Sequence, residues 1–182
     1  AINNIFSCFI FYIDFVDENF VPKISLDTKN VIRMRTFSKA YGMAGLRVGY
    51  AIGEKDLILN FEKIRNHFGM SRISQVGALA ALEDYDFISD VINKVKLSRN
   101  RIAEIANNNN CKFIPSFTNF VAIDCLKDSK FAKKVLENLI NNGVFVRMPY
   151  SYPQNRCIRV TVGLDKDIDL FEKYFPIALK ES

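Results

Sequence analysis

The segment Arg35-Thr-Phe-Ser-Lys-Ala-Tyr-Gly-Met-Ala-Gly-Leu-Arg-Val-Gly-Tyr50 says most about the fold of this chain. It overlaps the end of an apolar run, Val31 to Thr36, that predicts a buried strand. A lysine then follows a serine, and small residues lead to Arg47. These small residues let the backbone approach a ligand closely, and Ser38 and Arg47 offer a hydroxyl and a bidentate donor suited to a phosphate. The pattern is that of a strand whose end opens into an anion-binding turn.

Lys39 is the residue in this segment whose side chain could react covalently with a cofactor. A lysine whose pKa is lowered by partial burial and a neighbouring cation can form a Schiff base with an aldehyde cofactor. The spacing of serine, lysine and arginine alone does not decide between this chemistry and an ordinary surface cluster. The rest of the chain has to be considered.

Outward from this segment, short apolar runs alternate with stretches of helical periodicity, which predicts an α/β or α+β fold. The predicted strands are Ile5 to Ile13, Val31 to Thr36, Arg47 to Ile52, Phe120 to Cys125, Val144 to Arg147 and Cys157 to Val162. The predicted helices are Lys55 to His67, Ser74 to Asp84, Phe87 to Asn107, Lys130 to Asn141 and Asp167 to Leu179.

Two of these helices suggest how the chain is organised. The helix from Ser74 is small and apolar on most faces, so we expect it to be buried. The helix from Phe87 to Asn107 is long and charged on one side, as expected of a solvent-facing connector between two lobes. Its basic residues are expected on the solvated side. We place a domain boundary near residue 85, giving residues 1–85 and 86–182.

Composition and charge narrow the class of protein. The chain has 182 residues, 49 % of them hydrophobic and 25 % charged, which is typical of a globular protein and argues against disorder. No run is long enough to form a membrane-spanning helix. The net charge of +5 is spread along the chain, and motifs for nucleic-acid recognition are missing. We expect a soluble protein with neither a nucleic-acid nor a membrane partner.

The cysteines argue against metal binding and against a disulfide framework. Cys8, Cys111, Cys125 and Cys157 show no CxxC spacing and have no histidine companions. Reduced thiols fit a cytoplasmic protein, and the first apolar run lacks the basic segment and cleavage site of a secretory signal. We expect a cytoplasmic location and no bound metal.

The full segment from Arg35 to Tyr50 closely resembles the pyridoxal-phosphate lysine segment of class I/II aminotransferases, especially the histidinol-phosphate aminotransferase group. The resemblance implies that Lys39 forms the Schiff base with pyridoxal 5′-phosphate and later carries the proton between substrate and cofactor. It also implies that Ser38 and Arg47 hold the cofactor phosphate. The implied fold is α/β, a partial fold type I pyridoxal-phosphate transferase.

The resemblance continues towards the C-terminus. Ser116-Phe-Thr-Asn-Phe-Val and Gly143-Val-Phe-Val-Arg147 are similar to elements of the family's small domain, and Arg156-Cys-Ile-Arg-Val-Thr-Val-Gly163 is similar to its Leu-Arg-Ile-Thr-Val-Gly. Arg159 then takes the place of the arginine that binds the substrate carboxylate, a task for which a planar guanidinium fork is well shaped. Arg147 and Arg156 lack such a match and are interpreted as surface or supporting charges. The implied domains are the C-terminal part of the cofactor-binding large domain, residues 1–85, and an α+β small domain, residues 86–182.

N-terminal to the segment from Arg35 to Tyr50, the sequence departs from the pattern of the family. Tyr12-Ile-Asp-Phe15 aligns with the end of the family's Asp-Glu-Ala-Tyr element, which makes Tyr12 the partner of the cofactor's phenolic oxygen. The aspartate that pairs with the pyridinium nitrogen is expected three residues earlier, where this chain has Phe9. A phenyl ring cannot stabilise that nitrogen, so the cofactor would be a weaker electron sink. An alternative register uses Asp17-Glu18-Asn19-Phe20, but it puts Phe20 where the tyrosine hydroxyl is needed.

The resemblance therefore predicts the C-terminal half of an aminotransferase, truncated or frame-disrupted, with exposed sheet edges and apolar faces where the other half is missing. It implies transfer of an amino group between an amino acid or amine and a 2-oxo acid in amino-acid biosynthesis, and a homodimer in intact relatives. Two alternatives stay open. One is a remnant of the family without catalysis, and the other is an enzyme like the threonine-phosphate decarboxylases, which share the scaffold.

Overall fold

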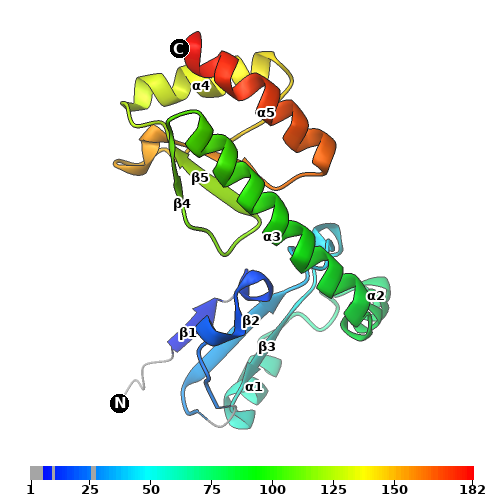
Figure 1. Cartoon of the computed structure of the whole chain (residues 1–182). Coiled ribbons are helices and arrows are strands. Elements are labelled where there is room, and N and C mark those ends of the chain that lie inside the picture. Colours follow the sequence, from blue (N-terminus) through cyan, green and yellow to red (C-terminus); the bar gives the residue numbers. More distant parts are fainter. Residues whose placement is uncertain (1–5, 10, 26–27) are drawn as a thin grey trace. The chain divides into compact units, whose positions relative to one another are not determined.

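The computed structural model describes residues 6–9, 11–25 and 28–182 (Figure 1). Ile5 and Ile10, which belong to the first predicted strand, lie outside the described residues. The strands are β1 (Phe6–Phe9), β2 (Val31–Thr36), β3 (Gly49–Gly53), β4 (Lys112–Ile114), β5 (Phe120–Asp124) and β6 (Cys157–Thr161). The α-helices are α1 (Lys55–Glu62), α2 (Arg72–Glu83), α3 (Tyr85–Asn108), α4 (Ser129–Asn141) and α5 (Asp165–Lys180). Short 3-10 turns cover Ile13–Phe15, Glu18–Phe20, Ala44–Leu46 and Gln154–Arg156.

The chain divides into two compact units, unit 1 (Ala1–Ile92) and unit 2 (Asn93–Ser182). The division falls inside α3, which contributes residues to both units, and lies seven residues after the boundary expected at residue 85. The expected assignment of the two parts to a large and a small domain stays a prediction.

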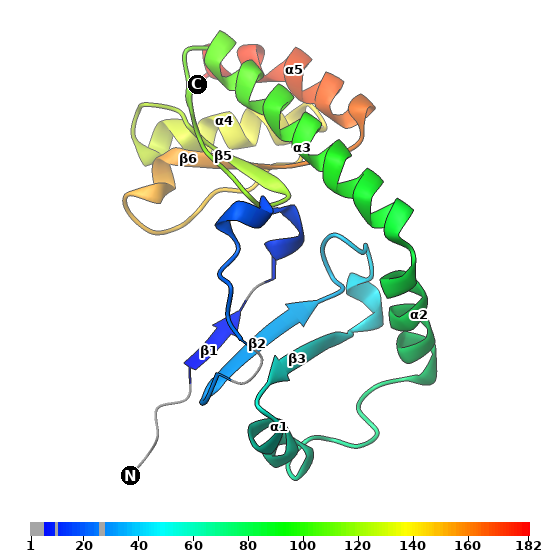
Figure 2. The ribbon, with the colours of Figure 1, turned by 60° about the horizontal axis from the view of Figure 1, so that its bottom comes forward.

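Unit 1 is built on a three-stranded sheet with the order β1-β2-β3 (Figure 2). β1 runs parallel to β2, with Phe9 opposite Met34, and β3 runs antiparallel to β2, with Thr36 opposite Gly49. The carboxyl ends of β1 and β2 therefore lie at one edge of the sheet, and β3 begins at that same edge. The segments that follow β1 and β2, and the one that precedes β3, are brought together there.

The turn between β2 and β3 is shaped by glycines. Gly42 has a φ of +68°, in the left-handed region that glycine occupies without strain. Gly49 lies so close to β2 that a Cβ atom on it would be 2.7 Å from the Arg35 carbonyl oxygen. The buried Phe37 packs against Tyr41 with the two rings tilted and their centroids 4.9 Å apart, and it anchors the start of the turn.

Unit 2 contains a second three-stranded sheet, with the antiparallel order β4-β5-β6. Its apolar side chains form one continuous core with residues of α3, α4 and α5, in which Ile102, Ile123, Leu139 and Phe175 are fully buried. Arg147 pairs with Arg159 through a single backbone bridge beside β6.

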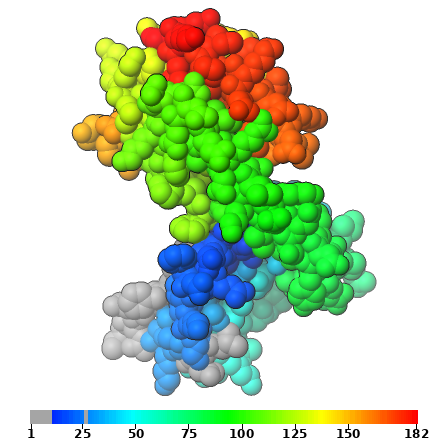
Figure 3. Space-filling model, viewed as in Figure 1, coloured from blue at the N-terminus to red at the C-terminus, as the bar shows by residue number. Residues whose placement is uncertain are grey.

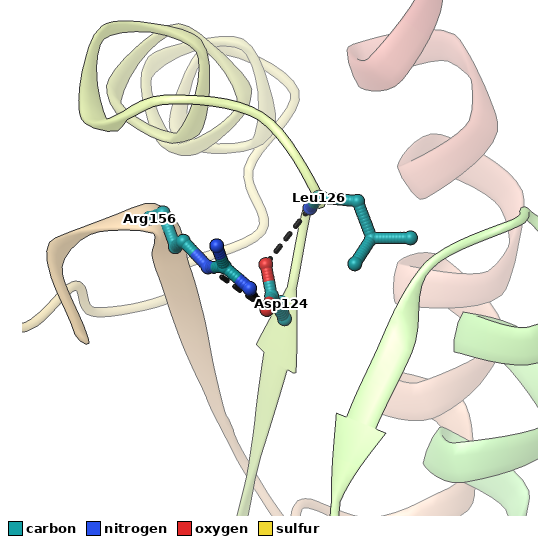
Figure 4. Close-up of polar contacts among 3 residues, drawn as sticks. All are labelled: Asp124, Leu126 and Arg156. Atoms are coloured by element: carbon teal, nitrogen blue, oxygen red, sulfur yellow. Dashed lines mark hydrogen bonds and ion pairs between the residues drawn. The ribbon is translucent and has the colours of Figure 1, made fainter. Parts of the chain in front are cut away.

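A partly buried ion pair ties the ends of β5 and β6 together (Figure 4). The Arg156 guanidinium donates to Asp124, with its Nε 2.9 Å from the carboxylate Oδ2. The other carboxylate oxygen accepts from the backbone N–H of Leu126 at 2.8 Å. Asp124 is buried, so both of its oxygens are satisfied by protein groups.

The structure confirms most of the predicted elements and corrects several details. Val144 to Arg147 forms no extended strand, only the bridge at Arg147, because it pairs at a single point. β4 was not predicted, since its three residues give too short a pattern. The helix predicted over Lys55 to His67 ends at Glu62. Strand β1 ends at Phe9, and Ile13 belongs to a 3-10 turn instead of the predicted strand.

Two burial expectations were wrong. The helix predicted to be buried from Ser74 corresponds to α2, in which Ser74 is the one buried residue and most of the apolar side chains are exposed. Arg99 of α3 was expected on a solvated side but is partly buried. It donates to the Thr118 carbonyl oxygen at 3.1 Å, and burial lowers the pKa of its guanidinium.

None of the helices in the described ranges is long and apolar enough to cross a membrane. The same residues contain no group of three or more His, Cys, Asp or Glu side chains that could hold a metal ion.

Candidate functional site

Four of the five predicted site residues lie at the sheet edge where β1 and β2 end. Tyr12 follows β1, Ser38 and Lys39 follow β2, and Arg47 lies two residues before the start of β3. The parallel pairing of β1 and β2 makes this convergence a consequence of topology. In open α/β sheets, the space outside the carboxyl ends of the strands is the usual place for a ligand.

Tyr12 and Lys39 are neighbours at this edge. The Lys39 Nζ lies 5.2 Å from the centroid of the Tyr12 ring. Both residues are partly buried. The sequence separates them by 27 positions, and the sheet brings them together.

Ser38 and Arg47 line a common cavity of about 460 Å³. Met34, Arg35, Thr36 and Tyr50 of β2 and β3 are among its other lining residues. The Thr36 hydroxyl lies 2.9 Å from the Ser38 Oγ and also accepts from the Ser38 backbone N–H at 3.1 Å. A small oxyanion in this cavity would have hydroxyl donors on one side and a guanidinium on the other.

Arg47 adopts an unusual backbone conformation, with a φ of +51°. Its side chain is exposed, and one guanidinium nitrogen donates to the Ala44 carbonyl oxygen at 2.8 Å. The remaining guanidinium donors of Arg47 have no protein partner that the structure records in the described chain. They are available to an anion without breaking an ion pair.

An ion pair between Asp14 and Arg35 stands beside the cavity and was not anticipated. The Asp14 side chain is only 8 % exposed and pairs with Arg35 of β2. Burial raises the pKa of nearby Tyr41, with a further contribution from the Asp14 charge, so the Tyr41 hydroxyl stays protonated. This pair holds the Tyr12–Phe15 turn against β2.

Arg159, the fifth predicted site residue, belongs to unit 2. β5 and the Arg147 bridge flank it on either side, and its guanidinium lies over the Phe120 ring, 4.7 Å from the centroid. Its Nε is buried and has no hydrogen-bond partner among the described residues. A buried donor without a partner costs free energy, and an anionic ligand at the guanidinium would reduce that cost.

Arg159 lines a second cavity of about 850 Å³, and Arg147 and Lys133 line it too. The sequence reasoning set Arg147 aside as a surface or supporting charge. One pattern could have placed Arg147 on the exposed side of this segment. Buried and exposed residues alternate there, with Val144 and Val146 buried and Phe145 and Arg147 exposed. The cavity thus has three cations along its wall.

Phe9 is the last residue of β1, and its side chain lies outside the described part of the structure. The consequence drawn from its sequence position therefore stays a prediction.

Comparison with known proteins decides the family. The family model for class I and II aminotransferases matches residues 10–170. The chain belongs to the class I and II aminotransferase family. It is 39 % identical over 155 residues to the histidinol-phosphate aminotransferase of Aliarcobacter butzleri, which covers 84 % of this chain and 42 % of the relative.

Solved structures agree with this aminotransferase assignment. The histidinol-phosphate aminotransferase of Sinorhizobium meliloti, solved in complex with pyridoxal-5′-phosphate, is 43 % identical with a TM-score of 0.93. The match covers 97 % of this chain and 49 % of that one. The L-threonine-O-3-phosphate decarboxylase of Porphyromonas gingivalis shares the fold, at 20 % identity and a TM-score of 0.80.

This aminotransferase chain thus has the fold of about half of a fold type I pyridoxal-phosphate enzyme. It spans about two fifths of the length of the curated relatives it matches and about half of the solved ones.

Proposed function

We propose that this chain carries the lysine side of a pyridoxal 5′-phosphate site and the carboxylate-binding arginine of a histidinol-phosphate or aromatic amino-acid aminotransferase. The observation that carries the proposal is the convergence of Tyr12, Ser38, Lys39 and Arg47 at the edge where β1 and β2 end. Residues 1–85 then form the C-terminal part of the cofactor-binding large domain, and residues 86–182 form the small domain.

Each residue has a task that suits its chemistry. The Ser38 hydroxyl and the free donors of Arg47 bind the cofactor phosphate in the cavity between them. The Tyr12 hydroxyl donates to the phenolic oxygen. Lys39 would hold the cofactor through its Nζ, and the same Nζ, as a free amine, would accept the proton from the substrate α-carbon. When bound, pyridoxal phosphate supplies the electron sink for that proton transfer.

Arg159 binds the carboxylate of the amino acid or 2-oxo acid. Its unpartnered Nε and its place on the wall of a cavity that Arg147 and Lys133 also line support this role. Several cations on one cavity suit a substrate with more than one negative charge, as a phosphorylated amino donor has.

The first test is cofactor capture at Lys39. Purified chain is mixed with pyridoxal phosphate, the visible absorbance is recorded, and the product is reduced with borohydride and mapped by mass spectrometry. We expect a visible band and the label on Lys39. Lys39→Ala removes both, and Lys63→Ala, which removes an exposed lysine of the same unit, leaves both intact. A label spread over surface lysines, or a band in Lys39→Ala, contradicts the proposal.

The second test is the response to an amino donor. Glutamate or histidinol phosphate is added to the loaded chain, and loss of the band is followed. Arg159→Ala should weaken this response and leave cofactor capture unchanged, because Arg159 contacts the substrate carboxylate and not the cofactor.

A second candidate is a remnant that captures the cofactor without transamination, and the observation that favours it is Phe9 at the position of the expected aspartate. A band on Lys39 that no amino donor bleaches would support this candidate. Phe9→Asp should then restore the response if the missing carboxylate is the cause.

A further inference from the structure

Two cysteines that are 14 positions apart in the sequence meet in unit 2. The register of β4 and β5 pairs Lys112 with Asp124, and continuing it by one residue places Cys111 opposite Cys125. Residues directly opposite each other in an antiparallel pair point to the same face of the sheet. Both cysteines belong to the continuous apolar core of unit 2. The two side chains therefore enter the same core from neighbouring strand ends.

The backbone hydrogen bonds show which kind of cross-strand pair these cysteines form. The Cys125 N–H donates to the Arg156 carbonyl oxygen at 3.3 Å, and the Cys111 N–H donates to the Ala106 carbonyl oxygen at 3.0 Å. Neither amide is directed at the opposite cysteine, so the two residues form a non-hydrogen-bonded pair. In such pairs the Cα atoms are about 4.5 Å apart and the side chains approach most closely. That separation lies within the range of about 4.4–6.8 Å that a disulfide bridges.

The thiols of this pair are already in contact. The Cys125 thiol donates a hydrogen bond to the Cys111 sulfur, and this bond lowers the pKa of Cys111. Cys157, the third buried thiol of unit 2, stands opposite Asp124. Successive residues of a strand point to opposite faces, so Cys157 and Cys125 lie on opposite faces of the sheet. Among the thiols that the structure describes, Cys111 is the one that faces Cys125.

The pair lies at the edge of the core, within reach of a small solute. Cys111 is 8 % exposed. Its neighbours Asn110 and Lys112 are exposed, and so are the two residues that follow Cys125. The green and yellow-green part of the chain, which contains both cysteines, forms part of the molecular surface (Figure 3). The lowered pKa of Cys111 also increases its share of thiolate, which is the form that reacts with oxidants.

We propose that Cys111 and Cys125 form a site of reversible oxidation, at which a hydroperoxide converts the two thiols into a disulfide. The bond joins the residue that precedes β4 to the residue that follows β5. Its formation requires neither pyridoxal phosphate nor turnover, so this inference goes beyond the proposed function and can fail independently of it.

The reaction takes place in two balanced steps. With hydrogen peroxide, the Cys111 thiolate attacks one oxygen, the O–O bond breaks, and the hydroxide that leaves combines with the thiol proton to give water. The product at Cys111 is a sulfenic acid. The Cys125 thiol then loses its proton, its sulfur displaces the hydroxyl group from Cys111, and proton and hydroxyl group leave as a second water. The two thiols are oxidised by two electrons in total, and the peroxide is reduced to two waters.

The main test maps the oxidised cysteines in the full 182-residue chain. The chain is treated with hydrogen peroxide, remaining thiols are blocked with N-ethylmaleimide, and tryptic peptides are analysed by mass spectrometry without reduction. Cleavage after Lys112 separates the two cysteines, so their bond links the peptides 102–112 and 113–127. We expect this link within one chain as the main product, reversed by dithiothreitol, with Cys157 unlinked. A main link to another cysteine or to a second chain, oxidation without a link, or no reaction overturns the proposal.

A comparison with the unfolded chain shows whether the fold selects the pair. The same treatment in denaturing urea should give several pairings, because the register of β4 and β5 is then lost. If urea gave the same exclusive link, closeness in the sequence would explain it, and the proposal would be wrong. The oxidised chain without urea should keep the circular dichroism spectrum of the reduced chain. A loss of that spectrum also overturns the proposal, because the native register would not accept the bond.

Two matched variants test the order of the steps, since each removes one buried thiol of unit 2. In Cys125→Ala the link should be absent, and dimedone, which traps sulfenic acids, should label Cys111. In Cys157→Ala the link should form as in the unchanged chain, without dimedone labelling of Cys111. Loss of the link in Cys157→Ala, with its fold intact by circular dichroism, contradicts the assignment. If either variant fails to fold, the peptide map of the unchanged chain decides the proposal.

Discussion

The two units of this chain bury their apolar residues to very different extents. The continuous core lies entirely in unit 2, between Ile102 and Ala178. Of the largest fully buried side chains among the residues that the structure describes, Ile32 alone belongs to unit 1. Unit 1 nevertheless contains the apolar run of α2, most of which is exposed. Unit 2 therefore satisfies its own hydrophobic pattern, whereas unit 1 carries a pattern that its own residues do not satisfy.

This difference shows that an apolar stripe in a helix sequence does not by itself mean that the stripe is buried within the same chain. In α4 and α5 the apolar stripe describes contacts that the chain makes with itself. In α2 it describes contacts that the described chain does not make with itself. Because burial of apolar surface is the main stabilising contribution to folding, we expect unit 2 to carry most of the stability of the chain. Mutations that test the comparison can be ranked by their expected effect.

The largest difference is expected between core truncations in the two units. Phe175, fully buried in α5, packs against Phe171 with ring centroids 4.8 Å apart. Phe175→Ala should lower the free energy of unfolding by about 3–5 kcal/mol, because it leaves a cavity in a closed core. Leu79→Ala, on the exposed side of α2, should change it by less than about 0.5 kcal/mol.

Urea unfolding followed by circular dichroism measures both changes, and the lack of tryptophan makes this the convenient probe. Equal losses in the two variants would mean that α2 is covered in the free chain, and the contrast between the units would be lost.

The next effect is expected at the ion pair of unit 2. Asp124→Ala removes the acceptor of the Leu126 N–H and leaves the Arg156 guanidinium without its carboxylate. We expect a loss of about 1–3 kcal/mol, because the hydrogen bonds that the buried carboxylate accepts from Leu126 and Arg156 are lost. Arg156→Gln should cost less, because the Arg156 side chain is 48 % exposed and is solvated already. The same urea titrations give both values, and a larger loss in Arg156→Gln would reverse this assignment.

A smaller effect is expected where α2 meets its own unit. Ser74→Ala removes the hydrogen bond to the Leu46 carbonyl oxygen. The expected cost is about 1 kcal/mol, which makes amide exchange in α2 roughly fivefold faster. Gln75→Ala is the matched control, because Gln75 is exposed and its amide donates to Met70 only at 3.4 Å. Hydrogen exchange read by mass spectrometry separates the two, and equal acceleration would show that Ser74 does not anchor the helix.

The sequence predicted the elements well where a pattern was long enough to be distinctive. The boundaries of β2 were predicted residue for residue, and those of α4 to within one residue. β4 was not predicted, because three residues are too few to show the two-residue alternation of a strand. The predicted burial of α2 was wrong for the free chain, because periodicity reports what a helix is suited to contact and not what the chain provides.

The candidate site shows a similar limit. The resemblance of the segment from Arg35 to Tyr50 to the aminotransferase lysine segment named Ser38, Lys39 and Arg47 as candidates. The place of Tyr12 beside Lys39 depended on the parallel pairing of β1 and β2, which no local pattern encodes. The Asp14–Arg35 pair and the Thr36–Ser38 hydroxyl contact come from the same tertiary arrangement. A resemblance along the sequence can name candidate residues, while the pairing of the strands decides which of them meet.

The smallest effect concerns the thiols of unit 2. The register of β4 and β5 pairs Lys112 with Asp124, so Cys111 and Cys125 stand opposite each other just beyond that pair. A hydrogen bond from the Cys125 thiol lowers the pKa of Cys111, and the same bond raises the pKa of Cys125. A lowered pKa gives Cys111 more thiolate at neutral pH, so its alkylation should begin at a lower pH than that of Cys125.

Iodoacetamide labelling across a pH series, read by mass spectrometry, compares the pH at half-maximal rate for each thiol. This midpoint separates the pKa from the general slowing that burial imposes on the labelling of all three buried thiols. Cys125→Ala removes the donor and should move the midpoint of Cys111 upward. The pKa of Cys157 is raised by burial and by Asp124 without a contribution from Cys125, so its midpoint should stay where it is. A shift of both midpoints would mean that the substitution loosens the core of unit 2, whereas a shift of Cys111 alone identifies the Cys125 thiol as its donor.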